Sequence, residues 1–336
     1  MKLGTRGSQL ALWQARTVAR LIEEAGGPAC EIVVIRTAGD EAGTGLGPGG
    51  STLPAGDPGA PIAAAVPPPA AAPSGKSLFV KELEEALLDG RIDFAVHSSK
   101  DMPALLPDGM TIGAVLPRED PRDAVVLPSG ASPVADPAAL AAALGPAARI
   151  GTSSVRRVAQ LRHLLAGATF AGIRGNLDTR LRKLDAGACD AIVLASAGLR
   201  RLGHGDRISL AVPTDVCTPA PGQGIIAIEH AAGRDDVAAA LGPINAADAA
   251  DALAAERAVV RALGGGCQMP IGAIARIEGA DLAIAGVVIA PDASRVVRHE
   301  ARGPRRDAAA VGERLAAALL AGGAGEILEG VRNSGT

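Results

Sequence analysis

The first two thirds of the chain alternate short apolar runs with longer amphipathic stretches. The apolar runs predict buried strands, whereas apolar residues spaced three and four apart predict helices. The expected strands are residues 31–36, 94–97, 124–127, 149–151 and 191–195. The expected helices are residues 9–25, 78–89, 155–165 and 177–186. This alternation predicts an α/β fold with parallel sheets covered by helices, which bind ligands at the carboxyl ends of their strands.

The last third of the chain has a different pattern. A helix is expected over residues 247–263, and three strand-like runs follow it at 271–277, 282–290 and 295–302. Short turns join these runs, and a final helix follows them. We therefore expect a small α+β domain with a three-stranded antiparallel sheet.

Residues 42–75 fit neither pattern. Twenty-five of these 34 residues are Ala, Gly or Pro, and Asp57 is the only charged residue among them. Such a segment has too few large apolar side chains to form a core, so we expect it to be disordered.

The charge of the chain is unevenly distributed. The 336 residues carry a net charge of -3, which excludes a protein that binds polyanions over its whole surface. Between residues 149 and 207, however, there are eleven Arg or Lys and only four acidic residues, which predicts an anionic ligand. No apolar run reaches 18 residues, and the four cysteines have neither disulfide nor metal-site spacing. We therefore expect a cytoplasmic protein with no membrane span and no bound metal.

Two successive strand-to-helix turns combine hydroxyl and guanidinium groups. Residues 151–157 read Gly-Thr-Ser-Ser-Val-Arg-Arg, which brings hydroxyls, backbone N–H groups and two arginines to one helix start. Residues 174–176 read Arg-Gly-Asn, where Asn176 can cap a helix, and Arg180 lies one turn further on. A serine-capped helix with exposed arginines would explain the first turn alone. Two adjacent turns of this kind predict a ligand with several carboxylates.

The turn after the strand at 94–97 reads His-Ser-Ser-Lys-Asp-Met-Pro over residues 97–103. Lys100 and Asp101 together form a candidate acid/base or charge-stabilising group, and the alternative is a structural surface ion pair. His97 lies inside the apolar run, so we expect it to be a core histidine.

Cys267 lies in an open loop between an expected helix and an expected strand. Three glycines, residues 264–266, end the helix, and Pro270 prevents it from resuming. A thiol in such a loop is accessible for reaction, although most free cysteines are buried as small apolar residues.

Seven segments, spread in order over nearly the whole chain, match the motifs of one family. They are residues 10–15, 78–84, 97–103, 118–124, 151–157, 174–176 and 264–272. Together they resemble the porphobilinogen deaminase (hydroxymethylbilane synthase) family. The resemblance implies two domains similar to type II periplasmic binding proteins, with a cleft, and a small C-terminal α+β domain. It places domain 1 at residues 1–118 and 219–242, domain 2 at 119–218 and domain 3 at 243–336.

The resemblance also implies an activity. Enzymes of this family polymerise four porphobilinogen molecules head to tail into hydroxymethylbilane, for tetrapyrrole synthesis, and release ammonia at each step. Their primer is a dipyrromethane cofactor on a cysteine thioether, which corresponds to Cys267. The family's catalytic aspartate corresponds to Asp101, assisted by Lys100. The matching cofactor- and substrate-binding residues are Arg6, Ser8, Ser98, Lys100, Thr152, Ser153, Ser154, Arg156, Arg157, Arg174, Gly175, Arg180 and Arg201. The family resemblance also leads us to expect a monomer.

The chain departs from the family at residues 42–75, where the family has a much shorter mobile lid. Lys76 and Phe79 remain as lid residues, but Ala72 stands where the family often has a second lysine. We expect activity to survive, because the entropy cost of closing a loop grows only slowly with its length.

Two other functions remain open from the sequence. One is a non-enzymatic, two-lobed binder of a small polycarboxylate, which would carry no covalent group. The other is nucleic-acid binding through the basic region, but the aromatic residues that stack on bases are not interleaved there.

Overall fold

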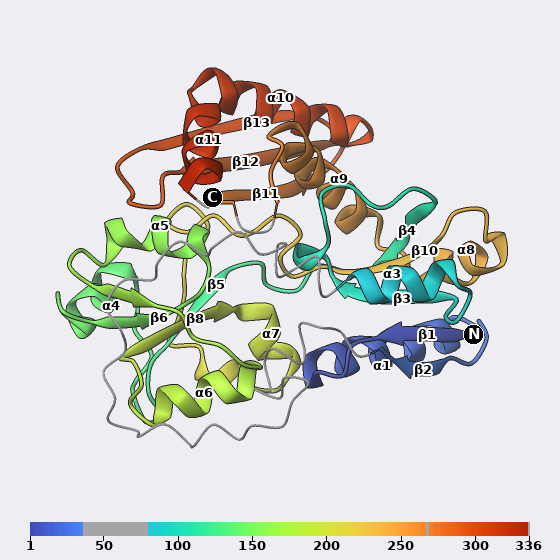
Figure 1. The fold of residues 1–336 in the computed structure, drawn as a ribbon, viewed down its shortest axis with the longest axis horizontal. Coiled ribbons are helices and arrows are strands. Elements are labelled where there is room, and N and C mark those ends of the chain that lie inside the picture. The colour runs from blue at the N-terminus through green and yellow to red at the C-terminus, as the bar shows by residue number, and fades with distance from the viewer. Residues whose placement is uncertain (36–79, 267–268, 335–336) are drawn as a thin grey trace.

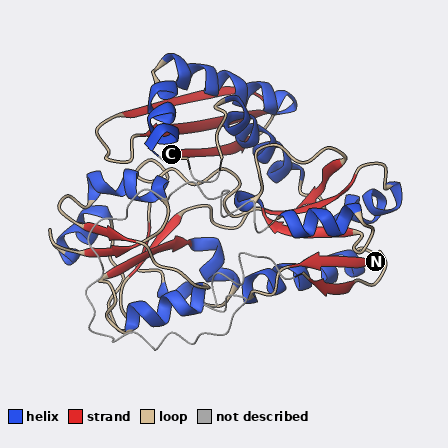
Figure 2. Cartoon of the chain, in the orientation of Figure 1, coloured by secondary structure: helices blue, strands red, loops and turns tan. Residues whose placement is uncertain are grey.

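The structure of the protein is a computed structural model that describes residues 1–35, 80–266 and 269–334. Four of the features expected from the sequence lie outside these ranges: the segment 42–75, Lys76, Phe79 and Cys267. The described part contains two five-stranded sheets and one three-stranded sheet, and helices cover each of them (Figures 1 and 2).

The first sheet has the strand order β2-β1-β3-β10-β4. Its strands are β1 (Lys2–Thr5), β2 (Glu31–Val34), β3 (Phe94–Ser98), β4 (Met110–Val115) and β10 (Ile226–Ala231). Strands β1, β2 and β3 are parallel, whereas β10 runs antiparallel to both of its neighbours. Phe94 and Val96 pack with helix α1 (Gln9–Glu24), and Ala95 packs with helix α3 (Lys81–Leu88). The two helices therefore cover opposite faces, as the alternation of side chains along a strand requires.

The second sheet repeats this arrangement in the order β7-β6-β8-β5-β9. Its strands are β5 (Asp123–Val126), β6 (Arg149–Gly151), β7 (Thr169–Ala171), β8 (Ala191–Ala195) and β9 (Leu210–Ala211). The fourth strand, β5, is again antiparallel to both neighbours. One face packs against α4 (Pro137–Leu144) and α5 (Val155–Leu164), the other against α6 (Leu177–Asp185) and α7 (Ser196–Arg201).

The α/β alternation expected from the sequence is confirmed, but the expectation of purely parallel sheets is wrong. Strands β5 and β10 are antiparallel because the chain enters each of them directly from the other sheet. Their direction is therefore set by a crossing between sheets and not by a local strand-helix-strand connection. The apolar pattern also missed short strands: β1, β4, β7, β9 and β10.

Two segments connect the two sheets. Residues 116–122 lead from β4 into β5, and residues 212–225 lead from β9 back into β10. They run close together, since the Glu119 amide donates to the Gly224 carbonyl at 3.1 Å. We call these residues the first and second crossing segments.

The third sheet is an antiparallel meander of β11 (Ile271–Glu278), β12 (Asp281–Ile289) and β13 (Val296–Pro304). One of its faces packs against α9 (Ala247–Ala262), α10 (Ala308–Ala321) and α11 (Ala324–Ser334) around one apolar core. Val287 and Ile289 on the other face contact Ala159 of α5, which joins this unit to the second sheet. The small α+β domain expected from the sequence is confirmed.

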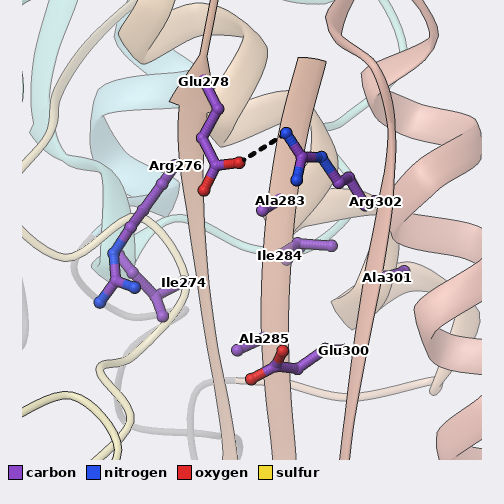
Figure 3. A pocket seen from close by; sticks show the side chains of 9 residues that line it. All are labelled: Ile274, Arg276, Glu278, Ala283, Ile284, Ala285, Glu300, Ala301 and Arg302. Carbon is purple, nitrogen blue, oxygen red and sulfur yellow. Dashed lines mark ion pairs between the residues drawn. The ribbon is translucent and has the colours of Figure 1, made fainter.

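Part of that outer face lines a cavity. Ala283 and Ala285 form the floor of a cavity of about 360 Å³, with Arg276 on one neighbouring strand and Glu300 and Arg302 on the other (Figure 3). The cavity lies on the third sheet alone, away from the strand ends where the sequence places the site.

Candidate active site

A small cavity lies at the carboxyl ends of β1 and β3. Its volume is about 80 Å³. The polar residues that line it are Arg6, Ser8, Gln14, His97, Ser98 and Asp101. The structure therefore brings together the expected site residues of two adjacent parallel strands, as an α/β sheet predicts.

The chain after β1 builds one wall of this cavity. The Ser8 hydroxyl caps α1 by accepting from the Ala11 amide at 3.3 Å, which satisfies one free N–H group of the helix start. Gln14, one turn further on, donates to the Ser98 hydroxyl at 2.8 Å. This bond ties α1 to the end of β3.

The chain after β3 forms a single 3-10 turn, Ser99–Asp101. Lys100 and Asp101 are half-buried, and the Lys100 ammonium donates to Gln223 Oε1 at 3.2 Å. Gly222 packs against this turn with φ of 75°, and a Cβ there would lie 2.5 Å from the Ser99 hydroxyl. Only glycine allows this close approach, which brings the second crossing segment against the Lys-Asp turn.

His97 is buried, as the sequence predicts, and is 6% exposed. Its Nε2 lies 3.0 Å from a carboxylate oxygen of the fully buried Glu229 on β10. Glu84 of α3 joins this group. Burial, together with the negative charge of Glu229, raises the pKa of Glu84 to about 7, and His97 partly opposes the shift. Acidic and basic groups thus extend from the cavity wall into the core of the first sheet.

The Gly-Thr-Ser-Ser-Val-Arg-Arg turn lies between β6 and α5. Ser154 caps the helix by accepting from the Arg157 amide, as the sequence predicts. The Ser153 hydroxyl donates to the Ile173 carbonyl at 3.2 Å, and the buried Thr152 hydroxyl accepts from the Ser154 amide at 3.3 Å. These hydroxyls therefore shape the turn itself.

Arg156 and Arg157 are buried, with only 4% and 8% of their surfaces exposed, and they share one carboxylate. The two guanidinium groups lie 2.7 and 2.8 Å from opposite oxygens of the fully buried Asp123. Burial by itself would raise the pKa of Asp123, but the two arginines hold it far below its usual range. Both arginines also donate to backbone carbonyls, at Thr218 and Val193. The turn is thus part of a buried ion cluster in which two arginines share one carboxylate and also donate to backbone carbonyls.

The next turn places Arg174, Gly175 and Arg180 around the start of α6. Arg180 Nε donates to the Gly175 carbonyl at 2.7 Å, and Gly175 has φ of 110°. Asn176 occupies the N-cap position, but its side chain makes no capping hydrogen bond, so that expectation is wrong. Burial lowers the pKa of Arg180, Arg157 lowers it further, and Asp101 opposes the shift. Arg180 therefore lies within electrostatic reach of Asp101 on the other sheet.

Arg201, the last residue of α7, contacts the second crossing segment and helix α1. Its guanidinium donates to the Gly224 carbonyl at 2.6 Å and lies 5.9 Å from the centre of the Trp13 ring. Burial lowers the pKa of Arg201 to about 10, and Glu119 partly opposes this shift.

Three of the predicted arginines fit a polycarboxylate ligand. Within the described residues, Arg174, Arg180 and Arg201 have no carboxylate within ion-pair distance. A guanidinium that is partly withdrawn from water without a counter-ion is costly, so Arg180 and Arg201 in particular favour a bound anion. The donor set therefore suits a cofactor that carries several carboxylates.

Sequence reasoning assigned no role to three buried polar residues near the site: Asp123, Gln223 and Glu256. Glu256 of α9 accepts from Arg118 and from the amides of Gly222 and Ala275. Asp123 lies within the family segment at residues 118–124, and Gln223 lies in the part of domain 1 that begins at residue 219, but their partners are distant along the chain. No local pattern identifies such partners.

The strand order and the site define an α/β protein with two similar five-stranded sheets, a third, smaller sheet and a site that is rich in cationic groups. A family model described as porphobilinogen deaminase, dipyromethane cofactor binding domain, matches residues 1–46 and 67–239. The model of the C-terminal domain of porphobilinogen deaminase matches residues 250–321. The chain belongs to the porphobilinogen deaminase family.

Curated relatives agree with this assignment. The porphobilinogen deaminase of Moorella thermoacetica is 44% identical over 334 residues, which cover 99% of this chain and 96% of that protein. The porphobilinogen deaminase of Bordetella parapertussis is 46% identical over 331 residues, which cover 98% and 95%. The chain is thus an enzyme, a transferase of tetrapyrrole synthesis that uses porphobilinogen and carries a dipyrromethane cofactor. The non-enzymatic binder considered from the sequence is not favoured.

Solved structures offer more distant likenesses. Substrate binding domain 2 of GlnP from Lactococcus lactis is 10% identical with a TM-score of 0.42, covering 78% of this chain and 89% of that chain. The VFT2 domain of BvgS from Bordetella pertussis is 16% identical with a TM-score of 0.38, covering 73% and 86%. The fold assignment rests on the strand order of the two sheets, which confirms the type II periplasmic-binding-protein-like architecture expected from the family resemblance.

Two further properties concern the described residues alone. No helix among them is long and apolar enough to cross a membrane. No group of three or more His, Cys, Asp or Glu within them is arranged to hold a metal ion.

Proposed function

We propose that Asp101 is the catalytic carboxylate of the polymerisation. It lies at the carboxyl end of β3, in one cavity with Arg6, Ser8 and Ser98, and within electrostatic reach of Arg180. Its place in that cavity at the carboxyl end of β3 is the observation that carries the proposal. Loss of ammonia from the aminomethyl group of porphobilinogen leaves positive charge on its pyrrole, and a fixed carboxylate stabilises such a charge. Asp101 is also proposed to stabilise the pyrrole nitrogens of the substrate, as the family resemblance implies.

We further propose that the expected binding residues fall into two groups. Arg174, Arg180 and Arg201, together with Arg6 and Lys100, bind the carboxylates of the cofactor and the growing chain. The groups that shape and support this wall are Ser8, Ser98, Thr152, Ser153, Ser154, Arg156, Arg157 and Gly175. Each substrate unit brings two carboxylates, so several cations in one region serve successive units.

Cys267 is the proposed attachment point of the cofactor. The described ends of its loop agree with the expected open connection, because α9 ends at Ala262 and β11 begins at Ile271. When bound, dipyrromethane supplies the free pyrrole carbon to which the first substrate unit is joined. Lys76 and Phe79, outside the described residues, are the proposed lid residues.

The domain limits follow the two crossing segments. We propose domain 1 at residues 1–118 and 219–242, domain 2 at 119–218 and domain 3 at 243–336. The protein is proposed to act as a cytoplasmic monomer without nucleic acid. Light scattering of the protein as it elutes from a size-exclusion column should give the mass of one chain. Binding to DNA at low salt would contradict the proposal that the protein binds no nucleic acid.

The intact mass of the purified protein tests cofactor attachment. We expect a mass above that of the sequence by two linked pyrroles, and Cys267→Ser should remove this increment. Cys30→Ser is the matched control, because Cys30 is a free, half-buried cysteine between the C-terminal end of α1 and β2, and it should keep the increment. A fully active wild type with the unmodified sequence mass would contradict the proposal.

A further inference from the structure

A histidine and a glutamate form a buried pair at the wall of the site cavity. His97 lines this cavity at the end of β3 and is 6% exposed, and Glu229 of β10 is fully buried. His97 Nε2 lies 3.0 Å from Glu229 Oε2. The roles proposed above for Asp101 and the arginines leave both residues of this pair without a task.

The pairing of β3 with β10 brings these two side chains together. The strands are antiparallel, and Glu229 lies opposite Ala95, two residues before His97. Side chains two residues apart share one face of a sheet, so His97 and Glu229 are diagonal neighbours. Ala95 packs against α3, which places the pair on the face that this helix covers. Glu84 of α3 lies within electrostatic reach of both members of the pair.

The stability of the fold does not explain this pair. Within the described residues, neither oxygen of Glu229 accepts a hydrogen bond, and His97 is the basic group beside it. Burying a carboxylate with so little compensation costs folding free energy, and well-packed apolar residues in place of such a pair are often as stable or more stable. Two protonable groups at the cavity wall therefore point to a part in the reaction.

The proposed reaction needs a proton acceptor in this cavity. When a substrate unit is joined, its methylene carbon forms a bond to the free ring carbon of the growing chain, and the C–H bond at that ring carbon breaks. The electron pair stays in the ring, and the proton must leave. The guanidinium and ammonium groups of the site are already protonated at neutral pH. Asp101 can take the proton, but it must be ionised again before it can stabilise the positive charge of the next unit.

We infer that His97 accepts this proton from Asp101 and so returns Asp101 to its ionised form, while Glu229 stabilises the imidazolium. This rests on the proposed catalytic role of Asp101. Imidazole gains and loses a proton near neutral pH, and a neighbouring carboxylate favours its charged form. His97 and Asp101 line one cavity of about 80 Å³, which has room for water to carry the proton between them. The imidazolium then gives the proton to the released ammonia, which leaves as ammonium.

Chemical rescue of a His97 variant tests this inference. His97→Ala removes the proton acceptor, so the kcat of the loaded enzyme with porphobilinogen should fall about a hundredfold while KM changes much less. Added imidazole should restore part of the kcat, because it supplies a base of the same kind. Pyrazole has a similar size and shape but is a much weaker base, so it should not restore kcat. Rescue by both compounds, or a kcat within a few-fold of the wild type, would overturn the inference.

Two further variants accompany this experiment. Glu229→Gln keeps the size of its side chain and removes the charge that stabilises the imidazolium, so it should also lower kcat, by a smaller factor. If His97→Ala does not fold, Glu229→Gln decides instead, and an unchanged kcat would overturn the inference. His204→Ala is the matched control. His204 Nε2 lies 3.1 Å from the Asp178 carboxylate, but both side chains are about a third exposed, so kcat should be unchanged and insensitive to imidazole.

Melting temperature and intact mass give readouts that do not depend on turnover. The double variant His97→Leu/Glu229→Leu should keep the mass increment of the cofactor and melt close to the wild type, because an apolar pair replaces a buried ionic pair at little cost. Its kcat should still fall. A double variant that melts early with a near-normal kcat would show that the pair is structural and overturn the inference.

Combination with Asp101→Asn separates this inference from the proposed function. Once Asp101 is replaced, His97→Ala should lower kcat little further, because no proton reaches His97 from Asp101. Additive losses of kcat would overturn the inference. If Asp101→Asn alone keeps its activity, the proposed role of Asp101 fails and the inference fails with it. If Asp101→Asn is inactive while His97→Ala keeps its activity, only the inference fails.

Discussion

The carboxylate of Asp123 lies 2.7 Å from the guanidinium of Arg156, and neither side chain is more than 5% exposed. Asp123 opens β5 of the second sheet, and Arg156 lies in the first turn of α5. With Arg157 on its other oxygen, Asp123 anchors the start of α5 to the strand that enters from the first sheet. The arginines that the sequence presents as an open anion site are thus also part of the core of the second domain.

Replacing Asp123 should destabilise the protein strongly. Asp123→Asn leaves two buried guanidinium groups without their counter-ion, and breaking a buried pair of this kind costs about 3–5 kcal/mol of unfolding free energy. Denaturant unfolding measures the loss. Asp190→Asn is the control, because Asp190 pairs with Arg149 on the surface, where ion pairs contribute little. Equal losses of unfolding free energy in the two variants would show that burial of the Asp123 ion cluster adds nothing to the stability of the protein.

The same cluster gives a stability change in acid. The pKa of Asp123 is depressed in the folded state, so its contribution is present above the pKa of an unfolded aspartate, about 4, and is lost as the pH falls. The difference in unfolding free energy between the wild type and Asp123→Asn should therefore shrink as the pH falls below about 4.

Glu84 should give a stability change of the opposite sign. Its pKa is raised from 4.5 to about 7, so its contribution is fully present below about pH 4.5 and is lost as the pH rises to about 7. Glu84→Gln removes the buried charge, and the variant should melt about 2 °C or more above the wild type at pH 8. Glu85→Gln, at an exposed position of the same helix, should keep the pH dependence of the wild type. A Glu84→Gln melting curve that follows the wild type at every pH would contradict the assignment.

Asp101→Asn should lower turnover by about a hundredfold or more without unfolding the protein. The amide keeps the shape of the side chain but neither stabilises positive charge nor accepts a proton. Turnover with porphobilinogen and the melting temperature are measured together, and Asp108→Asn, at an exposed aspartate seven residues away, is the control. Activity within a few-fold of the wild type would remove Asp101 from the catalytic role.

Shortening the Ala/Gly/Pro segment should leave cofactor attachment intact. The family model leaves residues 47–66 unmatched, in agreement with the insertion expected from the sequence. Replacing residues 46–71 by a short Gly/Ser linker should preserve the mass increment and the melting temperature and change turnover only modestly. Loss of folding in this variant would show that the segment contributes to the core.

The sequence by itself determined the local features of this protein. The apolar periods predicted β3, β6 and β8 and the helix α5 that follows β6, and a hydroxyl cap was expected at the start of α5, where Ser154 provides it. These features depend on residues a few positions apart, so their pattern is visible along the chain. The family motifs added the site residues, of which Arg6, Ser8, Ser98 and Asp101 line one cavity.

Only the tertiary structure decided the rest. Strands β5 and β10 are antiparallel because the chain crosses between sheets, and periodicity carries no information about strand direction. Asp123 and Arg157 are 34 residues apart, and Lys100 and Gln223 are 123 apart. A buried polar group needs its partner wherever the fold places it, so the contacts of Asp123 and Gln223 follow from the crossing of the two segments and not from any local pattern.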